Sequence, residues 1–273
     1  MWLGRREKIK GGERLLSSRI PIIFDTPREF EYIQLLLASD MHNGSAQFDE
    51  RKWSEFEKLI DDPHNYVVFC GDQLEYATKS SKSDCYEATR PSEQKRWWIE
   101  HLKGREDKIA AIIDGNHEFN RASKDADCFP LYDIALLLGI EDRYRSEAAF
   151  VDIGVGKRNN STGGKERQNR YVGRLNHKAQ NLVNYGTADS IEGIDFFVSG
   201  HTHKPMDKPL GKLVYDPQNK QVRERSVENI VCGHFLLYGG YGERGGMRVT
   251  SQKLYSLLLD GHTKRIETRG FYV

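Results

Sequence analysis

The chain has 273 residues, and its 41 lysines and arginines nearly balance its 40 aspartates and glutamates, for a formal net charge of +1. This balance argues against a protein that coats nucleic acid over its whole surface, although a local basic patch is compatible with it. Hydrophobic residues make up 38% of the chain and charged residues 30%, which is typical of a soluble folded protein and excludes a fully disordered one.

Predicted strands and helices alternate over most of the chain. Residues 1–30 are predicted to be a basic arm followed by an edge segment with Pro21, and residues 31–273 to be a single domain. The elements expected in chain order are a strand at 32–39, a helix at 49–61, a strand at 66–70, a loop at 77–90, a helix at 91–103, a strand at 109–113, a helix at 128–139, and strands at 148–155, 171–175 and 194–198. Residues 156–170 are predicted to form a flexible loop, and residues 211–273 only strands and turns. This order predicts a layered α/β fold with a second, mostly antiparallel sheet.

The cysteines and the N-terminus bear on the compartment. Cys70, Cys85, Cys128 and Cys232 are widely spaced and form no CxxC pair, which argues against a disulfide framework or a thiolate zinc site. Free thiols suit a reducing cytosol, and the first residues lack the apolar core of a secretory signal. No apolar stretch approaches the length of a membrane span. We therefore expect a cytoplasmic protein that is not bound to membranes.

Five predicted strands end in side chains that can bind a metal ion. In open α/β sheets, functional sites lie at the carboxyl ends of strands. A single histidine at such a place is more simply a core or surface residue, but five coincidences of strand end and donor are hard to explain by packing. In chain order the donors are Asp40 and His42, Asp72, Asn116 and His117, His177, and His201 and His203.

These donors stand in a recognisable order of motifs. They are Asp40-Met41-His42, Gly71-Asp72, Gly115-Asn116-His117-Glu118, an isolated His177, and Gly200-His201-Thr202-His203. The ordered set DxH, GD, GNH[DE], H and GHxH, over residues 40–203, resembles the calcineurin-like metallophosphoesterase superfamily. The resemblance implies a four-layer α-β-β-α sandwich, with mixed central sheets, that carries a dinuclear metal centre.

The resemblance also implies a role for each residue. One metal would be held by Asp40, His42 and His203, the other by Asn116, His177 and His201, and Asp72 would bridge the two. His117 would not bind a metal; it would face the substrate phosphate and stabilise or protonate the leaving oxygen. Lys178 follows His177 where the family more often has glycine. The role of Glu118 stays open, because it could orient His117 or raise its pKa, or simply be solvated. His234 is predicted to be structural.

The chemistry of such a centre follows from general principles. Two divalent ions about 3.5–4 Å apart clamp an in-line displacement at phosphorus and lower the pKa of a water that attacks it. Mixed imidazole, carboxylate and amide donors suit manganese, zinc or iron better than calcium, and we favour manganese. We therefore expect a hydrolase that cleaves phosphate esters with a metal-activated water.

The substrate is less clearly indicated. The segment after Gly71-Asp72 lacks the arginine found there in protein serine/threonine phosphatases, and it resembles the phage and prophage branch of the superfamily, which is often placed beside DNA-repair exonucleases. Basic residues crowd the approach to His177; they are Lys157, Arg158, Lys165, Arg167, Arg170, Arg174 and Lys178. We predict that this segment lies near the metals and that Arg167, Arg170 and Arg174 bind the substrate, the alternative being a solvated surface loop.

The leading hypothesis is a phosphodiesterase, or nuclease, that acts on a nucleotide or a nucleic acid. A phosphomonoesterase that acts on a small phosphorylated substrate is the second hypothesis. The third is a binding protein that keeps the fold without catalysis, against which the complete set of ligands argues.

Overall fold

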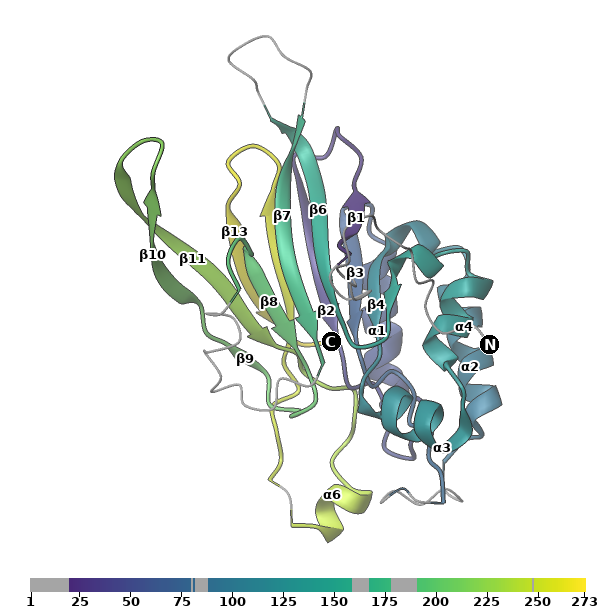
Figure 1. Cartoon of the computed structure of the whole chain (residues 1–273). Coiled ribbons are helices and arrows are strands. Elements are labelled where there is room, and N and C mark those ends of the chain that lie inside the picture. The colour runs from purple at the N-terminus through teal and green to yellow at the C-terminus, as the bar shows by residue number, and fades with distance from the viewer. Residues whose placement is uncertain (1–19, 80, 82–87, 159–166, 178–190, 247) are drawn as a thin grey trace, which may run out of the picture.

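Two β-sheets packed face to face form the centre of the protein (Figure 1). The computed structural model describes residues 20–79, 81, 88–158, 167–177, 191–246 and 248–273. The first sheet has the order β1 (Ile22–Asp25), β6 (Ala148–Arg158), β7 (Arg167–Asn176), β8 (Phe196–Ser199), β11 (Gln221–Val231) and β10 (Leu210–Asp216), and β9 (Met206–Asp207) pairs with β11. The second has the order β13 (Ile266–Phe271), β12 (Leu254–Asp260), β2 (Tyr32–Ala38), β3 (Asn65–Cys70), β4 (Ile109–Ile113) and β5 (Tyr144–Arg145).

Parallel neighbouring strands in each sheet determine where the residues of the sequence motifs lie. β2 is parallel to β3, and β3 is parallel to β4, so the residues that follow these strands meet at one edge of the six-stranded sheet. In the seven-stranded sheet β7 is parallel to β8, and β8 is parallel to β11. The DxH, GD and GNH motifs therefore emerge from one sheet, and His177 and the GHxH motif from the other.

The two largest parts of the core in the described residues lie on opposite faces of the six-stranded sheet, because successive side chains of a strand point to opposite faces of its sheet. Leu35 and Leu37 of β2 pack between the sheets, whereas Leu36 and Ala38 face the helices, and all four are fully buried. This burial on both faces explains why β2 reads as a continuous apolar run rather than an alternating one.

Helices cover the outer face of the six-stranded sheet (Figure 1). They are α1 (Glu50–Ile60), α2 (Pro91–Leu102), the short α3 (Lys124–Ala126) and α4 (Pro130–Leu137). α1 begins at the cap Asp49, whose carboxylate accepts from two backbone N–H groups, and it buries Trp53, Phe56 and Ile60. Each such side chain contributes about 1.5–3 kcal/mol when fully buried.

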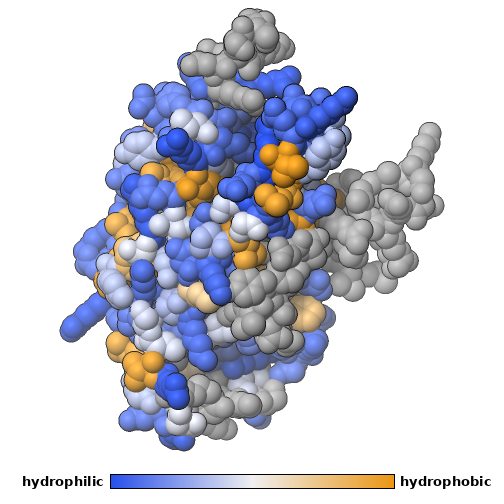
Figure 2. Space-filling model, turned by 90° about the vertical axis from the view of Figure 1, so that its left-hand side faces the viewer, coloured by the Kyte–Doolittle hydropathy of each residue, from blue (hydrophilic) through white to orange (hydrophobic). Residues whose placement is uncertain are grey.

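Most of the predicted elements are confirmed. The two mixed sheets of a metallo-dependent phosphatase-like fold are present, and the predicted edge segment is β1, which pairs in parallel with β6. Of the two helical layers, the described residues supply the one on the six-stranded sheet. Figure 2 shows the surface on the β10 side of the molecule, which is mostly hydrophilic with separate hydrophobic patches. The arm at 1–19 lies outside the described residues.

Two predictions about local structure were wrong. The predicted loop at 156–170 is shorter, because β6 continues to Arg158 and β7 already begins at Arg167. The predicted run of strands and turns from 211 to 273 is interrupted by a short helix, α6 (Gly240–Arg244).

Candidate metal centre

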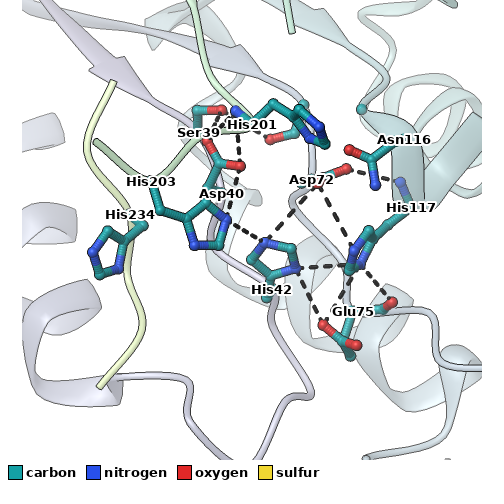
Figure 3. Close-up of polar contacts among 12 residues, drawn as sticks. Ser39, Asp40, His42, Asp72, Glu75, Asn116, His117, His201, His203 and His234 are labelled. Atoms are coloured by element: carbon teal, nitrogen blue, oxygen red, sulfur yellow. Dashed lines mark hydrogen bonds and ion pairs between the residues drawn. The ribbon is translucent and has the colours of Figure 1, made fainter. Parts of the chain in front are cut away.

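The seven predicted metal ligands lie together where strands of the two sheets end, and Figure 3 labels all of them except His177. Their donor atoms fall into two groups, within each of which the atoms lie within 4.8 Å of one another: Asp40, His42 and His203, and Asp72, His177 and His201. The seventh, Asn116, places its Oδ1 at 3.3 Å from His177 Nε2. The structure therefore brings the predicted ligands together in two groups, and their binding of metal stays a prediction.

The first group has the geometry of a cation site. His42 Nε2 lies 3.2 Å from His203 Nε2, and that atom lies 3.2 Å from Asp40 Oδ1. Two imidazole nitrogens and a carboxylate oxygen that face one point suit a divalent transition metal.

The second group is joined to the first through Asp72. Its Oδ2 lies 3.1 Å from His177 Nε2 and 4.0 Å from His42 Nε2. Its other oxygen, Oδ1, accepts a hydrogen bond of 2.8 Å from the backbone N–H of His117. One oxygen of Asp72 thus faces both groups while the other holds the carboxylate in place.

Hydrogen bonds to the opposite ring nitrogen orient two of the histidines. His42 Nδ1 lies 3.1 Å from Glu75 Oε2, and His177 Nδ1 lies 2.7 Å from the carbonyl oxygen of Cys70. If each Nδ1 donates its proton to that oxygen, each Nε2 keeps a lone pair that faces the centre. This arrangement is the usual one for histidines that bind metals.

Glu75 is the residue of the site that the sequence analysis missed. Its carboxylate accepts from His42, its carbonyl oxygen lies 2.9 Å from His117 Nδ1, and its Oε1 pairs with Arg121 Nη1 at 2.7 Å. His42, Glu75 and His117 also lie close enough to hold a metal, but these hydrogen bonds account for their contacts. The available signal was a carboxylate three residues after Asp72.

Glu118 has a clear role in the backbone of the site. Its carboxylate accepts from the backbone N–H groups of Gly115 at 2.8 Å, Leu74 at 3.0 Å and Asp72 at 3.1 Å. Burial raises the pKa of Glu118 to about 7, with a further contribution from the charge of Asp72. Glu118 therefore neither orients the His117 ring nor lies in solvent; it ties the GD loop to the GNH loop.

The backbone of the site is held in an unusual conformation. Positive φ angles occur at Asp40 (54°), His42 (50°), Asp72 (53°), His201 (72°) and His203 (54°). Such angles cost on the order of 1–3 kcal/mol at a residue that is not glycine, and they cluster at functional sites. Five of the nine non-glycine positive-φ residues in the described part of the chain belong to this site.

Two glycines of the motifs are needed for close approach. A Cβ at Gly115 would lie 2.1 Å from Asp72 Oδ1, and a Cβ at Gly200 would lie 2.0 Å from Ser39 Oγ and 2.6 Å from Asp40 Oδ2. The motif glycines are therefore required by the carboxylates beside them.

Comparison with known proteins identifies the family. Residues 33–205 match the family model of the calcineurin-like phosphoesterases. The chain belongs to this family. It is accordingly a metal-dependent phosphoester hydrolase, although the match does not distinguish the phage and prophage branch from the others. No helix in the described part of this phosphoesterase has the length and hydrophobicity of a membrane span.

Several solved structures are similar at low identity. The phosphoesterase Yfce from E. coli is 17% identical, with a TM-score of 0.42 over 84% of this chain and 88% of that chain. Vacuolar protein sorting 29 from Cryptosporidium parvum is 15% identical, with a TM-score of 0.41 over 90% of this chain and 100% of that chain. A metallophosphoesterase from Sphaerobacter thermophilus is 11% identical, with a TM-score of 0.40 over 88% and 90%. The comparison with curated proteins finds no match.

Burial and neighbouring charges in the phosphoesterase site shift the pKa values of its carboxylates and imidazoles. Burial alone would raise the pKa of the Asp72 carboxyl, but the His117 and His177 imidazoles outweigh burial and hold that pKa well below its usual range. Burial also opposes protonation of His177, yet Asp72 and Asp40 raise its pKa to about 10. A metal that bound His177 would therefore have to displace a proton from it. Burial lowers the pKa of His117 to about 4, so this ring is neutral at pH 7.

The three arginines predicted to bind the substrate do not gather at the metals. Arg170 precedes His177 by seven residues of an extended strand, which is about 23 Å, and Arg167 lies about 33 Å away. Arg170 is occupied by ion pairs with Asp152, at 2.8 Å, and with Asp25. β7 therefore holds Arg167 and Arg170 at a distance from His177, and their contact with substrate stays a prediction that this placement does not support.

Arg174 is the nearest of the three to the site. It precedes His177 by three residues, about 10 Å along the strand, and its guanidinium carbon lies 4.4 Å from the centroid of the Phe150 ring. Lys165 and Lys178, which completed the predicted basic segment, lie outside the described residues.

Proposed function

We propose that the chain is a dinuclear-metal phosphodiesterase that acts on a nucleotide or a nucleic acid. The observation that carries the proposal is the position of Asp72 Oδ2, which faces both groups of metal donors. One oxygen shared by two sites suits two metals close enough to act on a single phosphate.

The donors fit two divalent metals in kind and charge. Asp40 and Asp72 supply anionic oxygens, and His42, His177, His201 and His203 supply imidazole nitrogens, a mixture that suits manganese, zinc or iron. When bound, such metals would act as Lewis acids on the phosphoryl oxygens and lower the pKa of a water. The ligands are proposed residue by residue, with Asn116 in the set of Asp72, His177 and His201.

His117 is proposed to handle the proton of the leaving group. Its Nδ1 is turned to the carbonyl oxygen of Glu75, so its Nε2, which lies 3.9 Å from Asp72 Oδ2, faces the centre. An anionic phosphate in contact with this ring would favour the protonated form, and Glu75 Oε2, at 3.5 Å from Nδ1, would stabilise the resulting imidazolium. His117 can then donate from Nε2 to the leaving oxygen.

The surrounding charges support a diester over a monoester. A terminal phosphate carries up to two negative charges, whereas a diester carries one. Arg121, the arginine beside Glu75, already pairs with that carboxylate at 2.7 Å. Because Arg121 is already paired with Glu75, it is not placed to neutralise the second charge of a monoester. This supports a substrate with a single negative charge.

The basic residues bear on the length of the substrate. A nucleic acid that reached Arg170 from the metals would have to extend about 23 Å along β7. Arg174, about 10 Å from His177 along the strand, is the arginine of the predicted set that a short substrate would meet first. These positions support a nucleotide better than a long polymer.

The test compares bis-p-nitrophenyl phosphate with p-nitrophenyl phosphate on protein loaded with Mn²⁺. We expect the diester to have the higher kcat/KM. Preference for the monoester would overturn the diesterase proposal and favour the second candidate, a phosphomonoesterase. Turnover of neither, with two metals bound, would favour the non-catalytic binding protein. A panel of cyclic nucleotides, RNA, and single-stranded and duplex DNA would then identify the natural class of substrate.

A further inference from the structure

His203 differs from His42 and His177, two other proposed metal ligands, in how it is held. The Nδ1 atoms of His42 and His177 face oxygens of Glu75 and Cys70, which fix their rings. Within the described residues, no hydrogen bond reaches His203 Nδ1, and this side chain is 31% exposed, against 5% for His42 and 2% for His177. The polar contacts of the ring in the described residues lie at Nε2, which is 3.2 Å from Asp40 Oδ1 and from His42 Nε2, so another contact is needed to fix the rest of the ring.

The ring of His234 packs against His203. Their centroids lie 5.2 Å apart with an interplanar angle of 24°, a stacked arrangement that Figure 3 shows at the edge of the site. His234 follows β11, which is parallel to β8, so both histidines emerge at the same edge of the sheet. The stack is therefore built into the fold.

The two nitrogens of His234 are engaged by other groups. The backbone N–H of Leu236 donates to His234 Nδ1 at 3.2 Å, so Nε2 carries the proton and donates to Thr250 Oγ1 at 2.8 Å. With no lone pair left on either nitrogen, His234 is unsuited to bind a metal itself. Because its own ring is held in place, His234 can fix the orientation of the His203 ring that stacks on it.

Lys52 of α1 holds the backbone of His234. It is 4% exposed, and its Nζ donates to the His234 carbonyl oxygen at 2.7 Å and to the carbonyl and side-chain oxygens of Gln252 at 2.7 and 2.9 Å. No carboxylate of the described residues lies within ion-pair distance of this ammonium. These three oxygens accept the three protons of the Lys52 ammonium. Lys52 thereby ties His234 and Gln252, which lie before and after α6 in the chain, to α1.

We propose that His234, held by Lys52, is the positioning residue for the metal ligand His203. The stacked ring takes the place of the hydrogen bond that orients His42 and His177. The inference rests on the proposed metal centre and goes beyond it, because it names what orients one ligand of one metal. Its consequence is selective: loss of His234 weakens the metal held by Asp40, His42 and His203 and spares the other.

The experiment measures Mn²⁺ binding by calorimetry and metal counts in five single variants and one double variant. His234→Ala should weaken one of the two metals about 10- to 100-fold, the range seen when the outer partner of a ligand is removed. His234→Phe, which keeps a ring, should retain more affinity than alanine, and Lys52→Met should act in the same direction as alanine. In a His203→Ala background, His234→Ala should add no further loss. His262→Ala, at an exposed histidine, is the matched control and should change nothing.

Two results would overturn the proposal. One is a folded His234→Ala protein that binds both metals as tightly as the wild type. The other is an equal loss at both metals with a lower melting temperature, which would mean a structural role only. If His234→Ala does not fold, the metal affinities of His234→Phe and Lys52→Met are compared with those of the wild type and judged by the same two results. A wild type that binds two metals but cleaves neither test ester would refute the proposed function and leave this inference to be judged on metal affinity.

Discussion

Replacing Glu75 with glutamine tests whether its carboxylate orients a metal ligand. The side chain is 6% exposed and takes a hydrogen bond from His42 and an ion pair from Arg121. Glutamine has the same shape, but its amide NH₂ must face one of these two donors and leave it without an acceptor. A buried donor left in this way costs about 1–3 kcal/mol.

That cost should appear mainly as weaker metal binding. Since about 1.4 kcal/mol is a tenfold change in an equilibrium constant, we expect the Kd of the metal held by His42 to rise roughly 10- to 100-fold. At saturating Mn²⁺, turnover should fall less than in a His117 variant, because the Glu75 carbonyl still holds the His117 ring. Calorimetric titration with Mn²⁺ measures the affinity, and Glu55→Gln, at an exposed glutamate, is the control. Unchanged affinity at both metals would refute the reasoning.

Three further predictions concern single side chains. His117→Asn should keep both metals and lower kcat about 10²- to 10⁴-fold, as expected for the loss of a general acid, and a loss of metal would show that its role is misassigned. Arg170→Ala should leave kcat/KM on bis-p-nitrophenyl phosphate unchanged, since this arginine lies about 23 Å from His177 along β7, and a tenfold fall would contradict that placement. Burial lowers the pKa of His234 to about 3 from the 6.5 of an unfolded chain, so it favours the folded state above pH 6.5 and this stability is lost as the pH falls toward 3. The melting temperature of the metal-free protein should therefore fall more steeply below pH 6.5 in the wild type than in His234→Phe, and parallel curves would exclude this contribution.

The grouping of the proposed metal donors was predictable from the sequence because each follows a strand. Parallel strands bring their carboxyl ends to one edge, so Asp40, Asp72 and Asn116 had to meet once β2, β3 and β4 were recognised. The same rule could have found His234, which follows β11.

The residues that the sequence analysis missed or misplaced depend on geometry that a motif does not contain. Glu75 reaches His42 and His117 because the segment after Asp72 runs beside Asn43, to whose backbone Gln73 and Glu75 are hydrogen-bonded. Arg167 and Arg170 are close to His177 in the sequence, but an extended strand separates them from it in space. Nearness along a chain predicts nearness in space only within a turn or a helix, and here the segment is a ten-residue strand.

The central claim is that one oxygen of Asp72 joins two metal sites, and the number of metals bound per chain tests it most directly. Mn²⁺ should be counted in the wild type and in Asp72→Asn, by elemental analysis after dialysis and by calorimetric titration. The account predicts two ions in the wild type and weaker binding of both in the variant. A single ion in the wild type, or the loss of only one ion in Asp72→Asn, would contradict it.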